Sequence, residues 1–305
     1  MLIWNVFSQV LLPVVAMFGF GWILDRRFRL DLGTLVKLNI YLFVPAFMFV
    51  HVVGSHLDSS MALRVVGFTA CVIASMFFLG AVIGRIAGYD RPQLRSLQIA
   101  AMFYNSANYG IPLMTLAFPK VGPVFQVFIV LVQNVSCFTV GLFLANSSSN
   151  TGWRALLPML RQVSIWAILA ALLVRTFHLP VQDWRWLWVP LNYFSDGLVA
   201  LALVTLGVQL SQTEHRQSLS RISWALGLRL LIAPLLACAL VPLFGFTGET
   251  ARIMIVSTSF PTAVNTALLA HEFRADSHFA AAAVFYSTVA SMFTVTLLVV
   301  LVRIV

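Results

Sequence analysis

Charged residues are scarce in this 305-residue chain, which has 19 Lys and Arg and only 10 Asp and Glu. They amount to 10 % of the sequence, against about 25 % in an ordinary soluble domain. Hydrophobic residues make up 60 %, with 25 Phe and 8 Trp. A soluble globule of this length leaves about a quarter of its unfolded surface exposed, and this chain is too apolar to cover it. The composition excludes a soluble enzyme and also a disordered chain.

Residues for metal binding and catalysis are also few. The three cysteines, Cys71, Cys137 and Cys238, lie in apolar runs without CxxC spacing, so they predict neither a metal site nor a disulfide. His271-Glu272 lacks the second histidine of an HExxH motif. No Ser/His/Asp arrangement or phosphate-binding loop stands out. The sequence predicts no enzymatic activity, no cofactor and no metal.

Long, continuous apolar runs are what the chain has instead. Strands of a membrane barrel alternate apolar with polar residues, and these runs do not, so they predict membrane-spanning helices. At about 20 apolar residues per span, the chain has room for about ten. The predicted spans are Leu2–Leu24, Thr34–Val53, Val65–Ala87, Arg95–Ala117, Pro123–Ala145, Leu160–Phe177, Pro190–Leu210, Ser223–Phe244, Ala251–Ala270 and Phe279–Val302. The expected fold is an all-α polytopic membrane protein.

A polar stretch rich in Ser and Asn separates the fifth span from the sixth. It covers residues 146–159 and reads as a linker. It divides the chain into two halves of five predicted helices, residues 1–145 and 160–305. The first span has no basic residue ahead of it and is longer than the apolar region of a signal peptide, so it predicts a retained helix.

The basic residues indicate the orientation of the helices. Twelve of the 19 fall in loops after odd-numbered spans, six fall on the opposite side, and Arg229 lies inside the eighth span. Cytoplasmic loops carry the excess of Lys and Arg, so the bias predicts that both termini lie outside, on the periplasmic side of a bacterial inner membrane. The basic residues form no stripe interleaved with aromatic residues, so no nucleic-acid partner is predicted.

A shift of the chain by 157 residues reveals an internal repeat. The third and fourth spans align with the eighth and ninth without a gap, and five positions are identical. The identical pairs are Arg64 and Arg221, Gly88 and Gly245, Arg95 and Arg252, Phe103 and Phe260, and Asn108 and Asn265. Because each half has five helices, an odd number, the halves are predicted to have opposite orientations. Inverted repeats with a site between them recur in transporters.

The fourth and ninth spans are interrupted near their middles. Gly110 and Pro112 lie in the fourth span, and Pro261 lies in the ninth. A proline removes a backbone hydrogen bond and clashes with the preceding turn. In hydrocarbon, such a break persists only where it is buried in protein or lines a wet cavity. Two helix breaks at corresponding places in two repeats therefore predict the binding site.

Helix ends at these breaks are suited to an anion, because half-helix N-termini offer free N–H groups and a partial positive charge. Neutral side chains nearby would add donors and acceptors without a counter-charge. The predicted substrate-binding residues are Asn105, Asn108, Tyr109, Thr262 and Asn265. The alternative is that the prolines only kink packed helices and the asparagines join neighbouring helices. The paired arrangement favours a site.

Asp196 and Arg229 are charged residues well inside predicted spans. Asp196 is a candidate for coupling, because acidic residues in spans are rare and often functional, but near its helix end a solvated cap is an equal alternative. Arg229 is a candidate to neutralise a substrate carboxylate or to pair with Asp196, and the alternative is snorkelling to the interface. Asn39, Asn134 and Ser287 are expected to bond between helices or to line the cavity, with the packing role favoured.

Three motifs resemble those of one transporter family. Asn108-Tyr-Gly-Ile-Pro-Leu, Phe260-Pro-Thr-Ala-Val and Tyr286-Ser-Thr-Val-Ala-Ser resemble motifs of the auxin efflux carrier family, which includes plant PIN-type auxin exporters and bacterial malate and malonate carriers. The resemblance covers nearly the whole chain. The long central loop of the plant members is missing, so the chain resembles a compact prokaryotic member. Ser195-Asp196-Gly197 departs from the family, where many bacterial members carry small residues and a proline.

The resemblance implies two inverted five-helix repeats whose fourth and ninth helices cross at their prolines. It implies a scaffold of helices 1, 2, 6 and 7, usually a homodimer interface, and a transport domain of helices 3–5 and 8–10 that moves like an elevator. The crossover asparagines that help to bind the substrate carboxylate in plant relatives match Asn108 and Asn265. The expected function is secondary active transport of a small organic anion across the lipid bilayer. The alternative is a membrane ligand sensor without flux.

Overall fold

The computed structural model describes residues 8, 12–55, 58–145, 162–213, 219–264, 266, 269–270 and 275–304. These residues are largely helical, and no strand is found among them. Five of their helices are long and apolar enough to cross a membrane: Leu32–Val53, Ser59–Ile86, Arg185–Gln212, Ile222–Phe244 and Ser277–Val302. Two shorter apolar helices cover Gly122–Cys137 and Val163–Thr176. The chain is a polytopic all-α membrane protein, and the number of ten crossings stays a prediction.

The helices overlap the predicted runs, and their ends differ from the predicted ends by several residues. Those of the first half are α2 (Leu12–Phe28), α3 (Leu32–Leu38), α4 (Val44–Val53), α5 (Ser59–Ile86), α6 (Arg91–Met102), α7 (Ile111–Ala117) and α8 (Gly122–Ala145). Those of the second half are α10 (Val163–Thr176), α11 (Arg185–Gln212), α12 (Leu219–Gly227), α13 (Ala233–Leu240), α14 (Gly248–Thr258) and α16 (Ser277–Ile304). Three π-helical turns continue these helices: η2 (Asn39–Phe43), η3 (Ser106–Gly110) and η5 (Leu228–Ile232). The predicted linker of residues 146–159 and the pair His271-Glu272 lie outside the described residues.

Acidic residues begin two of the long helical segments. Asp58 precedes α5, and Asp90 accepts a hydrogen bond from the backbone N–H of Gln93 (2.8 Å) at the start of α6. A carboxylate at this position satisfies a free N–H group and interacts favourably with the positive helix end. The hydroxyl of Ser60 also donates to Asp58 and lowers the pKa of that carboxyl. These polar residues mark where the chain enters its apolar helices.

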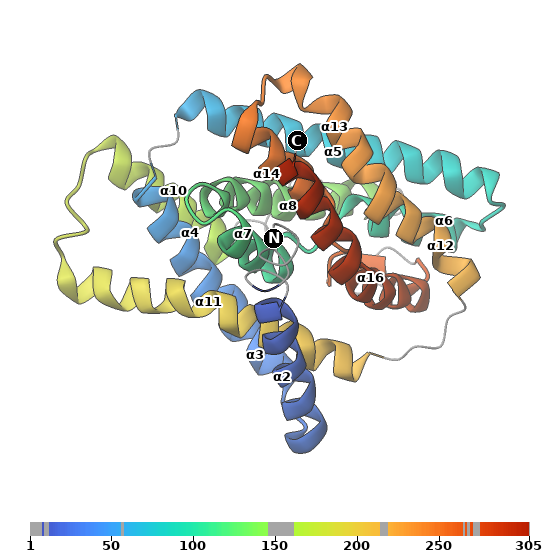
Figure 1. The fold of residues 1–305 in the computed structure, drawn as a ribbon, viewed down its shortest axis with the longest axis horizontal. Helices are drawn as coiled ribbons and strands as arrows, with labels where there is room; N and C mark the ends of the chain where they lie inside the picture. The colour runs from blue at the N-terminus through green and yellow to red at the C-terminus, as the bar shows by residue number, and fades with distance from the viewer. Residues whose placement is uncertain are drawn as a thin grey trace.

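The helices form two packed groups. In the first group, α2 and α4 pack along α11, and α10 packs against α4. In the second group, α5 packs against α6 and α8, and α16 packs against α6, α12 and α14. Figure 1 shows the first group at the left and bottom of the view, and α5 and α13 at the top. The groups meet where α11 contacts η3 and α7 and where α4 contacts α8.

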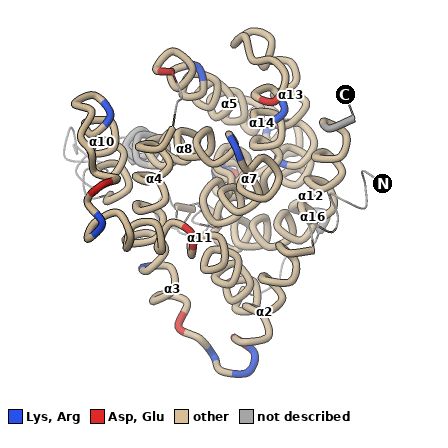
Figure 2. The backbone as a smooth tube through the Cα atoms, turned by 60° about the vertical axis from the view of Figure 1, so that its left-hand side comes forward, with Lys and Arg blue, Asp and Glu red and all other residues tan. Residues whose placement is uncertain are grey.

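The exterior of the helices is apolar. Phe20, Ile86, Trp186 and Phe293 lie on four different helices, and their side chains are between 62 % and 78 % exposed. Figure 2 shows that the charged residues lie mainly at helix ends and in loops, such as the loop between α2 and α3. An apolar exterior of this extent marks a membrane-facing surface. It agrees with a chain whose helices are surrounded by lipid.

Two glycines set the distance between α2 and α11. A Cβ atom on Gly21 would lie 2.9 Å from the Cα of Val204, and one on Gly207 would lie 2.9 Å from the backbone nitrogen of Trp22. Both distances are shorter than van der Waals contact. The two backbones touch because neither glycine carries a side chain, as in other close helix pairs of membrane proteins. This close contact joins α2 to α11 within the first group of helices.

Gly21→Ala is therefore expected to destabilise the protein. The added methyl group pushes α2 away from α11, and such overpacking costs about 1–3 kcal/mol. The measurement is the melting temperature of the purified protein in detergent micelles, which should fall. Gly19→Ala on the same helix is the matched control, because no atom lies within 4 Å of the added Cβ. Equal melting temperatures for the two variants would contradict the close crossing.

Candidate functional site

The fourth predicted span breaks between α6 and η3. α6 ends at Met102, Phe103 has an extended backbone (φ −99°, ψ 122°), and η3 begins at Ser106. The break lies ahead of Gly110 and Pro112, the residues at which the sequence pattern placed it. Pro112 occupies the first turn of α7, where a missing N–H group costs little. The chain leaves the helix earlier because its extended segment bonds to the second break.

The ninth predicted span breaks after α14. α14 ends at Thr258, and residues 259–264 are not helical. Pro261 lies inside this break, whereas Pro112 lies beyond the first one. Asn265, which corresponds to Asn108 in the repeat, lies outside the described residues.

The two breaks cross and bond to each other. Their extended segments run antiparallel, with the N–H of Asn105 donating to the carbonyl of Pro261 (2.8 Å) and the N–H of Ala263 donating to the carbonyl of Phe103 (2.9 Å). A broken helix leaves backbone groups without helical partners, and in an apolar interior these groups must be satisfied within the protein. Each break supplies partners for the other.

The residues that pair at the crossing lie in segments that the predicted repeat aligns. One bridge joins Tyr104 to Thr262, and the neighbouring bonded pair is Asn105 with Pro261. The offset of 157 residues carries Tyr104 onto Pro261 and Asn105 onto Thr262, so it exchanges the two pairs. The backbone hydrogen bonds do not follow this exchange, because the N–H of Thr262 donates to the hydroxyl of Ser287 and not to the carbonyl of Tyr104.

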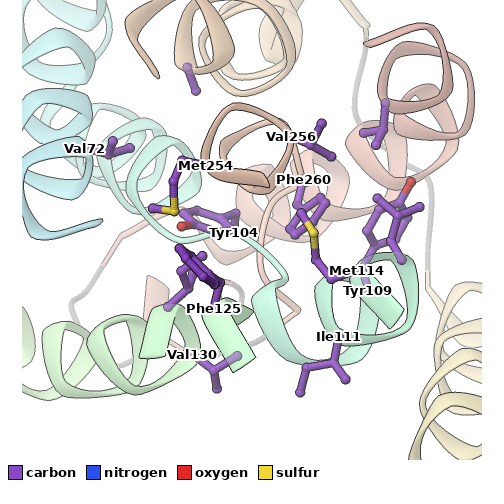
Figure 3. Close-up of a cluster of buried hydrophobic side chains, with 14 of the residues drawn as sticks. Val72, Tyr104, Tyr109, Ile111, Met114, Phe125, Val130, Met254, Val256 and Phe260 are labelled. Carbon is purple, nitrogen blue, oxygen red and sulfur yellow. The ribbon is translucent and has the colours of Figure 1, made fainter. Parts of the chain in front are cut away.

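Two of the predicted substrate-binding residues point into the core at the crossing. The ring of Tyr109 lies 5.6 Å from the ring of Phe260 (Figure 3). Thr262 is fully buried, and its hydroxyl donates to the carbonyl of Ala100 (3.1 Å). Its N–H donates to the hydroxyl of Ser287 (3.0 Å), which confirms the bond between helices expected of that serine. Tyr109 and Thr262 build the crossing.

Gly110 allows the second break to pack closely on the first. A Cβ atom there would lie 2.7 Å from the ring of Phe260 and 2.6 Å from Nε2 of Gln126. That Nε2 donates to the carbonyl of Ser106 (2.7 Å), the first residue of η3. In Figure 3 Phe260 lies beside Met114. The absent side chain of Gly110 thus leaves space for Phe260 and Gln126 at the crossing.

A cavity of about 110 Å³ lies beside the crossing, at the boundary between the two groups of helices. Its polar lining residues are Asn105, Ser106, Asn108, Gln133, Asn134, Gln162 and Ser164. Val36, Ile40 and Val44 of the first group line it as well. No charged residue is among the described residues that line the cavity. In the described part of the chain, no group of three His, Cys, Asp or Glu side chains could hold a metal ion. The cavity has room for a small ligand or a few water molecules.

The side chain of Asn105 has an unused donor at this cavity. The residue is 5 % exposed, and its Nδ2 has no hydrogen-bond partner. A buried donor without a partner costs about 1–3 kcal/mol, so this group is suited to a ligand or a water molecule. Gln133 also lines the cavity, and sequence reasoning missed it. Its signal was its place next to Asn134 within an otherwise apolar run.

Asn39 orients the amide of Asn108. Nδ2 of Asn39 donates to Oδ1 of Asn108 at 2.8 Å, which joins η2 to η3 across the boundary between the two groups. This contact confirms the bond between helices expected of Asn39. Because Oδ1 of Asn108 is occupied, its NH2 group remains for a further acceptor such as a carboxylate.

Arg229 is fully buried and bonds to both broken helices. Its guanidinium donates to the carbonyl of Ala101 (2.6 Å) in the last turn of α6 and to the carbonyl of Thr258 at the end of α14. Its Cζ lies 4.8 Å from the ring centre of Tyr104. Arg229 and Asp196, both within the described residues, form no ion pair, so the predicted pairing is wrong. Snorkelling is wrong too, because the side chain has no exposed surface.

Asp196 lies apart from this cluster. α11 begins at Arg185, earlier than the predicted Pro190, so Asp196 is about three turns inside the helix and no cap at its end. Its side chain is exposed and is close enough to His51 of α4 for an electrostatic interaction. Asp196 therefore belongs to the first group of helices and does not line the cavity.

Comparisons with known proteins identify the class. A family model described as "Membrane transport protein" matches residues 157–299. An uncharacterized transporter of Methanothermobacter thermautotrophicus is 25 % identical over 294 residues, which cover 95 % of this chain and 96 % of the relative. The chain is thus similar to membrane transport proteins. Both matches agree with the resemblance of the motifs at the crossing to those of a transporter family.

Asn39→Ala is expected to weaken the binding of a ligand that accepts a hydrogen bond from Asn108, without unfolding the protein. The amide of Asn108 loses the bond that orients it, which is worth about 1 kcal/mol, or about fivefold in affinity. The measurement is isothermal titration of the purified parent and variants with malonate and with malate. Asn192→Ala is the matched control, because Nδ2 of Asn192 bonds only within its own helix, to the carbonyl of Trp188. Equal affinities of the two variants would contradict the role of Asn39.

Proposed function

We propose that the protein is a secondary active transporter that moves a small organic anion by alternating access. The observation that carries this proposal is the cavity at the crossing, which is lined by amides and lies between two groups of helices. A carboxylate there would meet hydrogen-bond donors and helix ends instead of fixed charges. Mono- and dicarboxylates of the malate or malonate kind and auxin-like acids are the proposed substrates.

The donors for the anion come from the first break and its continuation. Asn105 contributes a buried N–H2 group without a partner, and Asn108 presents its N–H2 group because Asn39 occupies its oxygen. η3 and α7 follow directly, so the N-terminal end of this half-helix lies at the cavity. Such an end carries a charge of about +0.5. We propose Asn265 as the matching donor of the second break.

Inverted repeats of residues 1–145 and 160–305 are part of the proposal. They are supported by the pairing of corresponding segments at the crossing and by two glycines 157 residues apart. Gly88 and Gly245 have positive φ angles of 71° and 67°, a conformation that favours glycine. Each glycine follows a long helix and precedes the half-helix that ends at the crossing.

An elevator movement is supported by the position of the cavity. Because the cavity lies where the two groups of helices meet, a sliding of the second group along the first would carry the site from one face to the other. We propose that the first group is the scaffold and forms a homodimer. We also propose that the protein lies in a bacterial inner membrane with both termini on the periplasmic side.

The proposal is tested by binding and flux with one panel of acids. Acetate, malonate, malate and indole-3-acetate are screened by thermal shift, since a ligand at 100 times its Kd adds about 2.7 kcal/mol of stability. The stabilising acid should then enter proteoliposomes with saturable kinetics. Binding without uptake would identify a ligand sensor instead. No stabilisation by any organic acid would contradict the anion site.

Asn108→Ala and Asn265→Ala are each expected to weaken binding of that acid. Each change leaves a ligand oxygen without a donor, which costs roughly 1–3 kcal/mol, or about 5- to 150-fold in affinity. Equilibrium binding and proteoliposome uptake are measured on both, with Asn192→Ala as the control outside the cavity. Binding and transport like those of the parent in both variants would remove these asparagines from the site.

Asp196→Asn is expected to abolish the pH dependence of uptake if protons drive transport through this residue. Asparagine has nearly the same shape as aspartate but binds no proton in this pH range. Uptake is measured across a pH series with and without an imposed proton gradient. An Asp196→Asn carrier that keeps the pH profile of the parent would exclude Asp196 as the coupling group.

A further inference from the structure

The bonds of Arg229 reach the negative ends of two half-helices at once. Ala101 lies in the last turn of α6, and Thr258 is the last residue of α14. Carbonyl groups in a last helical turn have no helical partner, and each helix C-terminus carries a charge of about −0.5. One guanidinium therefore meets about one full negative charge, supplied by two helix ends.

The guanidinium of Arg229 lies in the interior of the protein. Arg229 lies on η5, the π-helical turn between α12 and α13, and π-helical turns are frequent at functional sites. Within the described residues no carboxylate bonds to it, and its Nε has no partner. Its charge is compensated by the two carbonyl groups and by the ring of Tyr104.

Without Arg229, the helix ends at the crossing would exert opposing electrostatic fields on an anion in the cavity. Where two broken helices meet, the N-terminal ends attract an anion and the C-terminal ends repel it. Tyr104 links Arg229 to the site, because it lies under the guanidinium and also lines the cavity. With the C-terminal ends neutralised by Arg229, the remaining field at the cavity is that of the positive end of η3.

We infer that Arg229 neutralises the C-terminal ends of α6 and α14 and thereby sets the sign of the ligand charge that the cavity accepts. The inference rests on the proposed anion site and assigns a specificity-determining role to a residue that does not line the cavity. Arg229 is a positioning residue, since it acts on the ligand through the two half-helices. A purely structural tie would influence charged and neutral ligands alike.

The experiment compares an acid with its uncharged amide. The probes are malonate with malonamide and indole-3-acetate with indole-3-acetamide, titrated into the parent and into Arg229→Gln, Arg229→Met and Arg229→Lys. The parent should prefer the acid. The neutral variants should bind the acid at least about tenfold more weakly, while their affinity for the amide stays within about twofold. Arg229→Lys should keep the preference, because it keeps the charge.

Two results would overturn the role of Arg229. One is an equal loss of affinity for the acid and the amide, and the other is an acid preference that the neutral variants retain. Gel filtration and melting curves identify the folded variants, and the result is taken from whichever of Arg229→Gln and Arg229→Met folds. The proposed function fails separately, when the parent binds neither acid or binds an amide as tightly as its acid.

Discussion

Backbone groups that are freed by breaking a helix inside an apolar interior must find partners within the protein, and the centre of this structure depends on that constraint. The two breaks satisfy it by crossing. Asn105 bonds to Pro261 and Ala263 bonds to Phe103 through the backbone. Arg229 bonds to one carbonyl at the end of each helix, those of Ala101 and Thr258. The result is a hydrogen-bonded crossing made from two segments that are far apart in the sequence.

The same constraint explains why a chain with few charges has a polar centre. The groups that hold the crossing together are backbone amides, hydroxyls and carboxamides, which need no counter-ion. Asn39 and Gln126 each bond to the first half-helix, and Ser287 bonds to the second break. Arg229, the one buried cation among the described residues, acts on helix ends. Asn105 is left with a donor at the cavity.

The positions of the helices were predictable from the sequence, because apolar runs of about 20 residues and interrupting prolines are local signals. The place of the first break was not. It lies at Phe103 instead of Pro112, because the antiparallel contact with the second break overrides the local proline signal. Pro112 is accommodated at the start of α7.

Contacts to the backbone were the least predictable part of the site. The sequence marked Arg229 as a charge inside a span, with a substrate carboxylate or Asp196 as its expected partner and snorkelling as the alternative. Its partners are carbonyl groups, which carry no signature in the side-chain pattern. Asn39 was expected to bond between helices, but only the fold identifies Asn108 as its partner. Tyr109 lies in the binding motif but points into the core.

The central claim is that the crossing itself is the ligand site. Amide hydrogen exchange of the purified protein, with and without a stabilising organic acid, measures it directly, because ligand contact slows local opening. The account predicts slower exchange in peptides that cover Phe103–Gly110 and Ser259–Ala263, with little change in α2. Protection by a bound acid that is confined to other helices would contradict it.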